Sequence, residues 1–72
     1  MKIEYSKEAD AIYVYFKEDF VEKSKEIEDG IVIDFDKNGQ LIGIEVLDAS
    51  KRFSLADIMN VNIENLPVEA IK

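Results

Sequence analysis

The chain lacks the two side chains on which most metal sites and acid–base sites depend, because its 72 residues contain no cysteine and no histidine. Disulfides and thiolate ligands are therefore excluded, and the commonest metal ligand and neutral-pH base are missing. We expect no cofactor and no metal centre. Small secreted domains usually carry disulfides, so their absence predicts a cytoplasmic location.

Positive charge is also scarce, since 9 Lys and Arg stand against 16 Asp and Glu, for a formal net charge of −7. Such a surface repels phosphate backbones, which argues against nucleic-acid binding by this chain alone. No apolar run approaches the roughly 18 residues of a membrane helix, so no membrane partner is expected. The charge favours a basic protein partner, and simple solubility is the competing explanation.

Glycine and proline are rare, with three and one residues, and between the turns apolar residues alternate with polar ones. This period of two is typical of half-buried strands. The predicted strands are 2–5, 11–17, 21–27, 31–36 and 40–47, with a sixth at 61–64 left open. The strand at 21–27 is mostly charged, which suits a sheet edge.

The last third of the chain carries a helix signal. Ser54 is a good N-cap, Asp57 completes a weaker form of the capping box, and the helix should end near Asn60. Residues 48–52 are expected to form a turn or a helical corner. The sequence thus predicts one α+β domain over residues 1–72. Its parts are an antiparallel β-meander in 1–47, and a turn, one short helix, a possible sixth strand and a tail in 48–72, which gives five to six strands in all.

Asn38-Gly39 is a strong hairpin signal, because a two-residue type I′ turn needs positive φ at both central positions. The implied register places apolar residues opposite one another on one face. The pairs are Phe35 with Ile42, Ile33 with Ile44, and Ile31 with Val46. This face is expected to be the core. Its members are Ile3, Tyr5, Ile12, Val14, Phe16, Ile31, Ile33, Phe35, Ile42, Ile44 and Val46, and its expected cover is Leu55, Ile58 and Met59.

The opposite face also carries apolar and aromatic side chains, and one helix cannot cover both faces. We therefore predict an interface, for a homo-oligomer or a basic partner, on this second face or at a sheet edge. The predicted interface residues are Tyr13, Tyr15, Phe20, Val32 and Leu41.

Residues 34–45 match the calcium-loop pattern D-x-[DN]-x-[DN]-G-x₅-E at every specified position. The residues concerned are Asp34, Asp36, Asn38 and Glu45, with Gly39 at the turn. A calcium loop joins two helices, whereas these flanks are β-branched and alternating. In a hairpin Glu45 and Asn38 would lie more than roughly 15 Å apart, so we interpret the match as a decoy. Weak, unspecific cation binding by Asp34 and Asp36 stays open.

Catalytic candidates are few. A nucleophile would have to be one of the hydroxyls of Ser6, Ser24, Ser50 or Ser54 with a Lys or carboxylate base, and no glycine-rich oxyanion loop accompanies them. The prediction is therefore a non-enzymatic protein-interaction module. The alternatives are a small-ligand or weak cation-binding domain and, third, a minor enzyme.

Several segments resemble the domain of unknown function 2283 family of short prokaryotic proteins. The matching segments are 3–5, 8–14, 28–36 and 39–51. Ser6-Lys7 departs from the Asp-Pro that the family often has, and the tail after Phe53 is less typical. The family has no established activity, so the resemblance implies no catalytic residue. It implies, by analogy, an acidic, antitoxin-like binding role.

Overall fold

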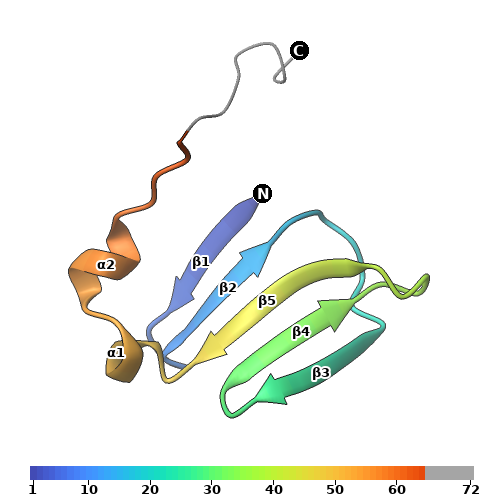
Figure 1. Ribbon diagram of the computed structural model, residues 1–72, viewed down its shortest axis with the longest axis horizontal. Coiled ribbons are helices and arrows are strands. Elements are labelled where there is room, and N and C mark those ends of the chain that lie inside the picture. The colour runs from blue at the N-terminus through green and yellow to red at the C-terminus, as the bar shows by residue number, and fades with distance from the viewer. Residues whose placement is uncertain (65–72) are drawn as a thin grey trace.

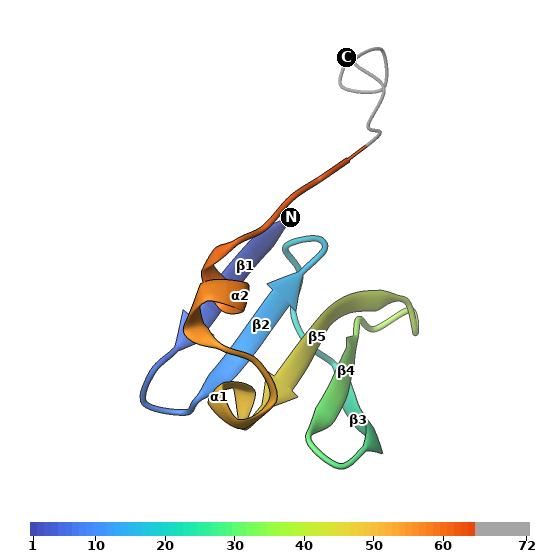
Figure 2. The ribbon, with the colours of Figure 1, turned by 60° about the vertical axis from the view of Figure 1, so that its left-hand side comes forward.

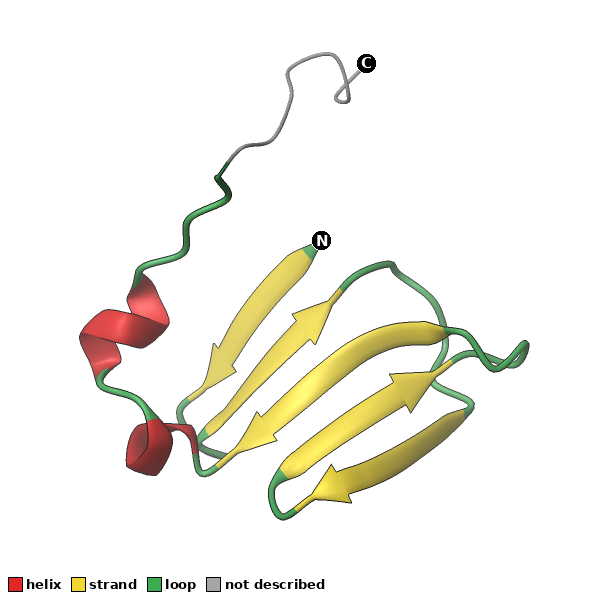
Figure 3. Ribbon diagram, viewed as in Figure 1, coloured by secondary structure: helices red, strands yellow, loops and turns green. Residues whose placement is uncertain are grey.

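The computed structural model describes residues 1–64 as one antiparallel sheet with two short helices beside it (Figures 1 and 3). The strands are β1 (Lys2–Ser6), β2 (Ala11–Tyr15), β3 (Lys23–Glu28), β4 (Ile31–Phe35) and β5 (Leu41–Leu47), and the helices are α1 (Ala49–Arg52) and α2 (Leu55–Met59). The predicted α+β class and antiparallel sheet are confirmed, with two helices in place of one. Residues 61–64 form no strand, and the predicted tail from 65 onward lies outside the described residues.

The strand order is β1-β2-β5-β4-β3, so the predicted meander is wrong in its connections. The segment 16–22 does not turn back beside β2 but crosses to the far edge of the sheet, where β3 lies (Figure 1). The apolar β5 takes the place beside β2, and the charged β3 lies at the edge as its composition predicted. A meander would have put this charged strand in the middle of the sheet.

The β4–β5 hairpin has the predicted register along most of its length. Ile31 lies opposite Val46 and Ile33 opposite Ile44, but Phe35 lies opposite Leu41 and not Ile42. The turn is one residue longer than predicted, because the Asp36 amide donates to the Gln40 carbonyl at 2.9 Å and Gly39 adopts φ +76°. This combination is typical of a three-residue loop with a glycine bulge. A second bulge near Leu41 shifts the register back, so the predicted pairs meet.

The helices are anchored at one end of the sheet by Asp10. Its carboxylate accepts hydrogen bonds from the Tyr5 hydroxyl at 2.9 Å and from the Ser50 amide and hydroxyl at 3.0 and 2.8 Å. Arg52 adds bonds to the carbonyls of Leu47 at 3.0 Å and Asp29 at 2.6 Å. These contacts hold α1 to the β1–β2 turn, through Asp10, and to the β3–β4 turn, through Asp29.

The apolar core is small. Among residues 1–64 the only buried apolar side chains are Ala11, Ile42 and Ala49. Strand register puts the other predicted core residues on one face, which we call the isoleucine face, and most of them are only half-buried. Helix α2 lies beside the β1 edge of the sheet (Figures 1 and 2), where Ile58 lines an open groove on this face with Ile3, Ile12 and Val14.

The predicted cover of the isoleucine face is only partly right. Ile58 is half-buried beside the sheet, but Leu55 and Met59 are 61% and 76% exposed and so cover little of it. The capping box of Ser54 and Asp57 is present, as predicted, whereas Asn60 ends the helix in an extended and not a left-handed conformation. A helix of five residues is too short to cover five strands. Within residues 1–64, no helix is long and apolar enough to cross a membrane.

Gly43 is required where β5 passes β2, because a Cβ atom there would lie 2.8 Å from the Val14 carbonyl oxygen. We expect Gly43→Ala to lower the free energy of unfolding by about 1–3 kcal/mol, since the neighbouring backbone must shift. Urea denaturation measures this change. Gln40→Ala, at an exposed position of the same hairpin, should change the value by less than about 0.5 kcal/mol. Equal stability of the two variants would contradict the close approach.

Candidate functional site

The face opposite the isoleucine face, which we call the tyrosine face, is organised as two rows that cross all five strands. The first, the glutamate row, consists of Glu4, Tyr13, Glu45, Val32 and Glu26. The second consists of Lys2, Tyr15, Gly43, Asp34 and Ser24. Glutamates two strands apart are separated by about 10 Å, because adjacent strands lie about 4.8 Å apart. Three carboxylates thus alternate with two apolar side chains across the sheet.

The centre of the tyrosine face is a pair of stacked rings on β2. The centroids of Tyr13 and Tyr15 lie 6.1 Å apart with an interplanar angle of 11°. Burial raises the pKa of the Tyr15 hydroxyl, and the nearby carboxylates of Glu4 and Glu45 raise it further. The ammonium group of Lys2 lies 5.8 Å from the Tyr15 centroid and 3.6 Å from Glu4 Oε2. The rings therefore lie in a strongly negative environment that already holds one cation.

Beside the rings lie two neighbouring carboxyl groups, those of Asp34 and Glu45. Asp34 is buried and accepts a hydrogen bond of 2.6 Å from the Ser24 hydroxyl. Burial raises the pKa of the Glu45 carboxyl, and a hydrogen bond to Asp34 and repulsion from its charge raise it further. Ionised Glu45 therefore destabilises the folded state, and a nearby cation would reduce this destabilisation.

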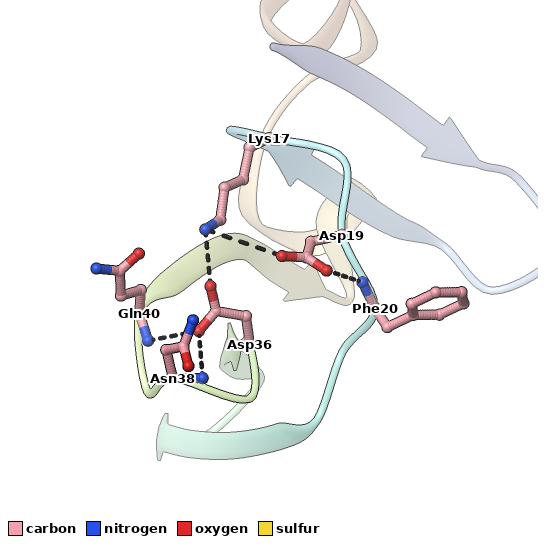
Figure 4. A network of polar contacts seen from close by, with 6 residues as sticks. All are labelled: Lys17, Asp19, Phe20, Asp36, Asn38 and Gln40. Atoms are coloured by element: carbon pink, nitrogen blue, oxygen red, sulfur yellow. Dashed lines mark hydrogen bonds and ion pairs between the residues drawn. The ribbon is translucent and has the colours of Figure 1, made fainter.

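The calcium-loop pattern serves a different purpose (Figure 4). The Oδ1 atom of Asp36 accepts hydrogen bonds of 2.9 Å from the amides of Asn38 and Gln40, and its Oδ2 accepts one of 2.7 Å from Lys17 Nζ. Lys17 also lies 4.0 Å from Asp19, whose Oδ1 accepts from the Phe20 amide. Asp36 thus closes the hairpin turn and ties the crossing segment 16–22 to it.

The hairpin predicted for residues 34–45 is confirmed, so the flanks of the pattern are strands and not helices. Within residues 1–64 no group of three or more carboxylates is placed to hold a metal ion. Both oxygens of Asp36 have partners within the chain, and Asp34 is held by Ser24. The four sequence-matched residues therefore do not converge on one point.

The five predicted interface residues fall into three places. Tyr13, Tyr15 and Val32 share the tyrosine face, as predicted. Phe20 lies in the crossing segment and is 90% exposed, and Leu41 lies opposite Phe35, on the isoleucine face. The bulge in β5 causes this change of side. That these residues form an interface stays a prediction.

Sequence reasoning missed Glu4, Glu26 and Glu45 as a set, because they come from β1, β3 and β5. The alternation of polar and apolar residues predicts which face of its own strand each glutamate lies on. It does not predict that β2 pairs with β5, and this pairing is what brings the three glutamates into one row. The four serine hydroxyls all have hydrogen-bond partners among residues 1–64. Ser6 accepts from the Ala9 amide, Ser24 donates to Asp34, Ser50 donates to Asp10, and Ser54 caps α2.

We expect Asp36→Asn to lower the midpoint of thermal unfolding by several degrees, and Asp36→Ala to lower it more. Asparagine keeps an oxygen for the turn amides but cannot accept from Lys17, whereas alanine loses both interactions. Lys17→Met keeps the aliphatic stem and should match Asp36→Asn. Calorimetry measures the three midpoints, and equal values for the asparagine and alanine variants would contradict the turn-closing role.

The pH dependence of these variants provides a second check. The hydrogen bond from Lys17 holds the pKa of Asp36 below its ordinary value of 3.8. A lowered carboxyl pKa stabilises the fold above the unfolded-state pKa, and this contribution is lost as the pH falls through the folded-state pKa. The difference in thermal midpoint between the native chain and Asp36→Asn should therefore be largest at neutral pH and should shrink in strong acid.

Glu45→Gln is expected to change the thermal midpoint in the direction opposite to Asp36→Asn. Because the Glu45 pKa is raised above its ordinary value of 4.5, its protonated form suits the fold, and its contribution to stability falls as the pH rises through the folded-state pKa. The variant should raise the thermal midpoint at pH 7 and leave it unchanged near pH 3. Glu8→Gln, in the exposed β1–β2 turn, is the control. An equal gain at both pH values would show that charge is not the cause.

Comparison with known proteins places this chain in a family. It is 44% identical over 55 residues to an uncharacterized protein of Methanocaldococcus jannaschii, covering 76% of this chain and 47% of the relative. It is 36% identical over 70 residues, 94% of this chain and 56% of the relative, to a Methanosarcina mazei protein named "Putative hypoxanthine phosphoribosyltransferase". The chain thus spans about half the length of these curated relatives. No solved structure matches it.

A family model matches residues 2–50, which include all five strands and the Asp10–Ser50 contact that anchors α1. Its description is "Protein of unknown function (DUF2283)". The resemblance stated from the sequence is confirmed over this range. The chain belongs to the family of proteins of unknown function DUF2283.

Proposed function

We propose that this domain is a non-enzymatic protein-interaction module whose tyrosine face binds a basic segment of a partner protein. The observation that carries the proposal is the glutamate row, in which Glu4, Glu45 and Glu26 alternate with Tyr13 and Val32. Lysine and arginine combine a cation with an apolar stem, so they suit alternating carboxylates and apolar side chains. Because strand spacing sets the distance between the carboxylates, a partner needs basic residues about 10 Å apart.

Lys2 supports this choice of partner. Its ammonium group lies near the Tyr15 ring and Glu4, at 5.8 Å from the ring centroid and 3.6 Å from the carboxylate. Cations bind over aromatic faces, and more strongly where water is excluded. Tyr13 lies between Glu4 and Glu45, so a partner's cation placed there would have two carboxylates within reach.

The electrostatics of Glu45 also support the proposal. Burial and Asp34 raise its pKa, so ionised Glu45 is destabilised in the free domain. A partner's cation would stabilise the ionised form and lower this pKa. The net charge of −7 would speed association with a basic protein and make that association sensitive to salt.

The Methanosarcina relative's name suggests an enzyme, but nearly half of that protein lies outside the match. A phosphoribosyl group carries a phosphate, which the glutamate row would repel. The four serine hydroxyls have structural partners, and the chain has neither histidine nor cysteine. These features favour binding over catalysis.

Affinity capture from the native host tests the proposal with two variants of equal charge. The face variant carries Glu4→Gln, Glu26→Gln and Glu45→Gln, and the control carries Glu8→Gln, Glu18→Gln and Glu22→Gln at exposed positions outside the row. We expect the native chain and the control to retain the same basic protein, and the face variant to bind it at least about tenfold more weakly. Three ion pairs of up to about 1 kcal/mol each account for that loss.

Raising the salt concentration should release the partner from the native chain. Equal weakening in the two variants would mean that overall charge and not the tyrosine face binds the partner. Equal retention by all three chains would place the binding surface elsewhere, and both results would contradict the proposal.

A further inference from the structure

Tyr13 is the one member of the glutamate row that places an aromatic ring between two carboxylates. It lies directly opposite Glu4 on β1 and directly opposite Glu45 on β5. Directly opposite residues on neighbouring strands have Cβ atoms about 5 Å apart and side chains on the same face. The ring and the two carboxyl groups therefore form one patch with the ring in the middle, which we call the Tyr13 patch.

Tyr15, two residues along the same strand, has different neighbours. Lys2 lies opposite it on β1, and Gly43 lies opposite it on β5. The ring lies close to the space above the glycine, because a Cβ atom at Gly43 would lie 3.6 Å from Tyr15 Cδ1. The Lys2 ammonium group lies 5.8 Å from the centroid of the Tyr15 ring. The chain's own lysine thus fills the cation position at this second ring.

The corresponding position at Tyr13 has no cation from the described part of the chain. Among residues 1–64, the only cation close to an aromatic ring is Lys2, at Tyr15. The two tyrosine rings are nearly parallel, with an interplanar angle of 11°, and Tyr13 is only half-buried. Lys2 shows that this surface holds a cation beside a ring and one carboxylate. The Tyr13 patch offers a ring and two carboxylates.

We infer that the cation which a partner places on the tyrosine face is an arginine, stacked on Tyr13 and hydrogen-bonded to Glu4 and Glu45. This inference rests on the proposed function and names the partner's chemistry at one position. A guanidinium group is planar, stacks on aromatic faces and carries five N–H donors in a fixed fork. Its donors can therefore reach carboxylates on two sides while its plane lies over the ring.

The spacing of the carboxylates favours arginine over lysine. Glu4 and Glu45 are two strands apart, which is about 10 Å. The ammonium group of lysine is a compact point charge, so it can approach the ring and one carboxylate but not both carboxylates at once. The donors of a guanidinium group extend toward both sides and shorten each gap.

Both glutamates can take part in this arrangement. The contact of Glu4 with Lys2, at 3.6 Å, is longer than a hydrogen bond between charged groups, and the Glu4 side chain is 51% exposed. Burial and the neighbouring Asp34 raise the pKa of the Glu45 carboxyl. A guanidinium group at hydrogen-bond distance would favour the ionised form of Glu45 and lower this pKa.

The next position along the row does not distinguish the two basic residues. Val32 lies between Glu45 and Glu26 and offers an apolar side chain without a ring. Arginine and lysine both have an apolar stem and a cation, so either suits it. Val32 is about 10 Å from Tyr13, a distance that three residues of an extended chain span. The partner's segment therefore needs one arginine and, three residues away, either basic residue.

Titration of the full chain with three synthetic peptides, followed by amide NMR shifts, tests the arginine. The peptides share one glycine- and serine-rich sequence with two basic residues three positions apart. These are two arginines, one arginine with one lysine, or two lysines, so the charge is constant. We expect the two arginine-containing peptides to bind within about twofold of each other, and the lysine peptide at least about threefold more weakly, because one position has a ring.

Two variants at Tyr13 separate the ring from the apolar surface. Tyr13→Phe keeps the ring and should keep the preference for arginine. Tyr13→Leu keeps an apolar side chain and should bind all three peptides equally. Glu4→Gln should weaken binding of the arginine peptides more than that of the lysine peptide, with Glu8→Gln in the exposed turn as control. If Tyr13→Leu loses the strand signal in circular dichroism, the three peptides on the native chain decide the matter.

Equal affinity of the native chain for all three peptides would overturn the inference, as would the absence of binding by any of them. A preference for arginine that survives in Tyr13→Leu would also overturn it. A graded series, in which each arginine strengthens binding by the same factor, would contradict a single ring position.

Capture from the native host is a separate measurement. A basic protein that the native chain retains and the face variant loses would uphold the proposed function even if the three peptides bind equally well. Failure of the arginine contact and failure of the proposed function are therefore distinguishable.

Discussion

The pairing of β2 with β5 is the contact on which the rest of the structure depends. It joins the β1–β2 hairpin to the β3–β4–β5 unit, and it places Ile12 opposite Val46 and Val14 opposite Ile44 on one face. On the other face the same pairing sets Glu45 beside Tyr13. Burial of the apolar side chains on the first face stabilises the pairing. The same pairing fixes the positions of the polar side chains on the second face. Without it neither the isoleucine face nor the glutamate row would be continuous.

Residues 1–64 form a single-layer sheet, and this explains why few of their apolar side chains are fully buried. A chain of 72 residues has little surface to bury, and two helices of four and five residues cover only one side of one face. The structure therefore relies on polar anchors more than on a deep core. Asp10 holds α1 to the β1–β2 turn, and Asp36 holds the crossing segment to the hairpin. Among residues 1–64, the side chains on the faces between these anchors are mostly half-buried or exposed.

The match to a calcium loop shows how far a local pattern can be trusted. Asp36, Asn38 and Gly39 satisfy the pattern because a tight turn needs the same residue types, with an oxygen to accept from turn amides and a glycine at positive φ. The β-branched flanks correctly predicted a hairpin. What they could not predict was Lys17, which approaches Asp36 from 19 residues away.

The sequence by itself determined most of each strand, the pairing of Ile31 with Val46 and of Ile33 with Ile44, and the capped helix, because alternation, the turn at Asn38-Gly39 and Ser54 with Asp57 act over a few residues. Only the tertiary structure decided which strands are neighbours. Pairing β2 with β5 closes a loop of more than two dozen residues, and its stabilisation comes from apolar contacts that no local pattern specifies. For the same reason the glutamate row, assembled from β1, β3 and β5, became visible only in the folded sheet.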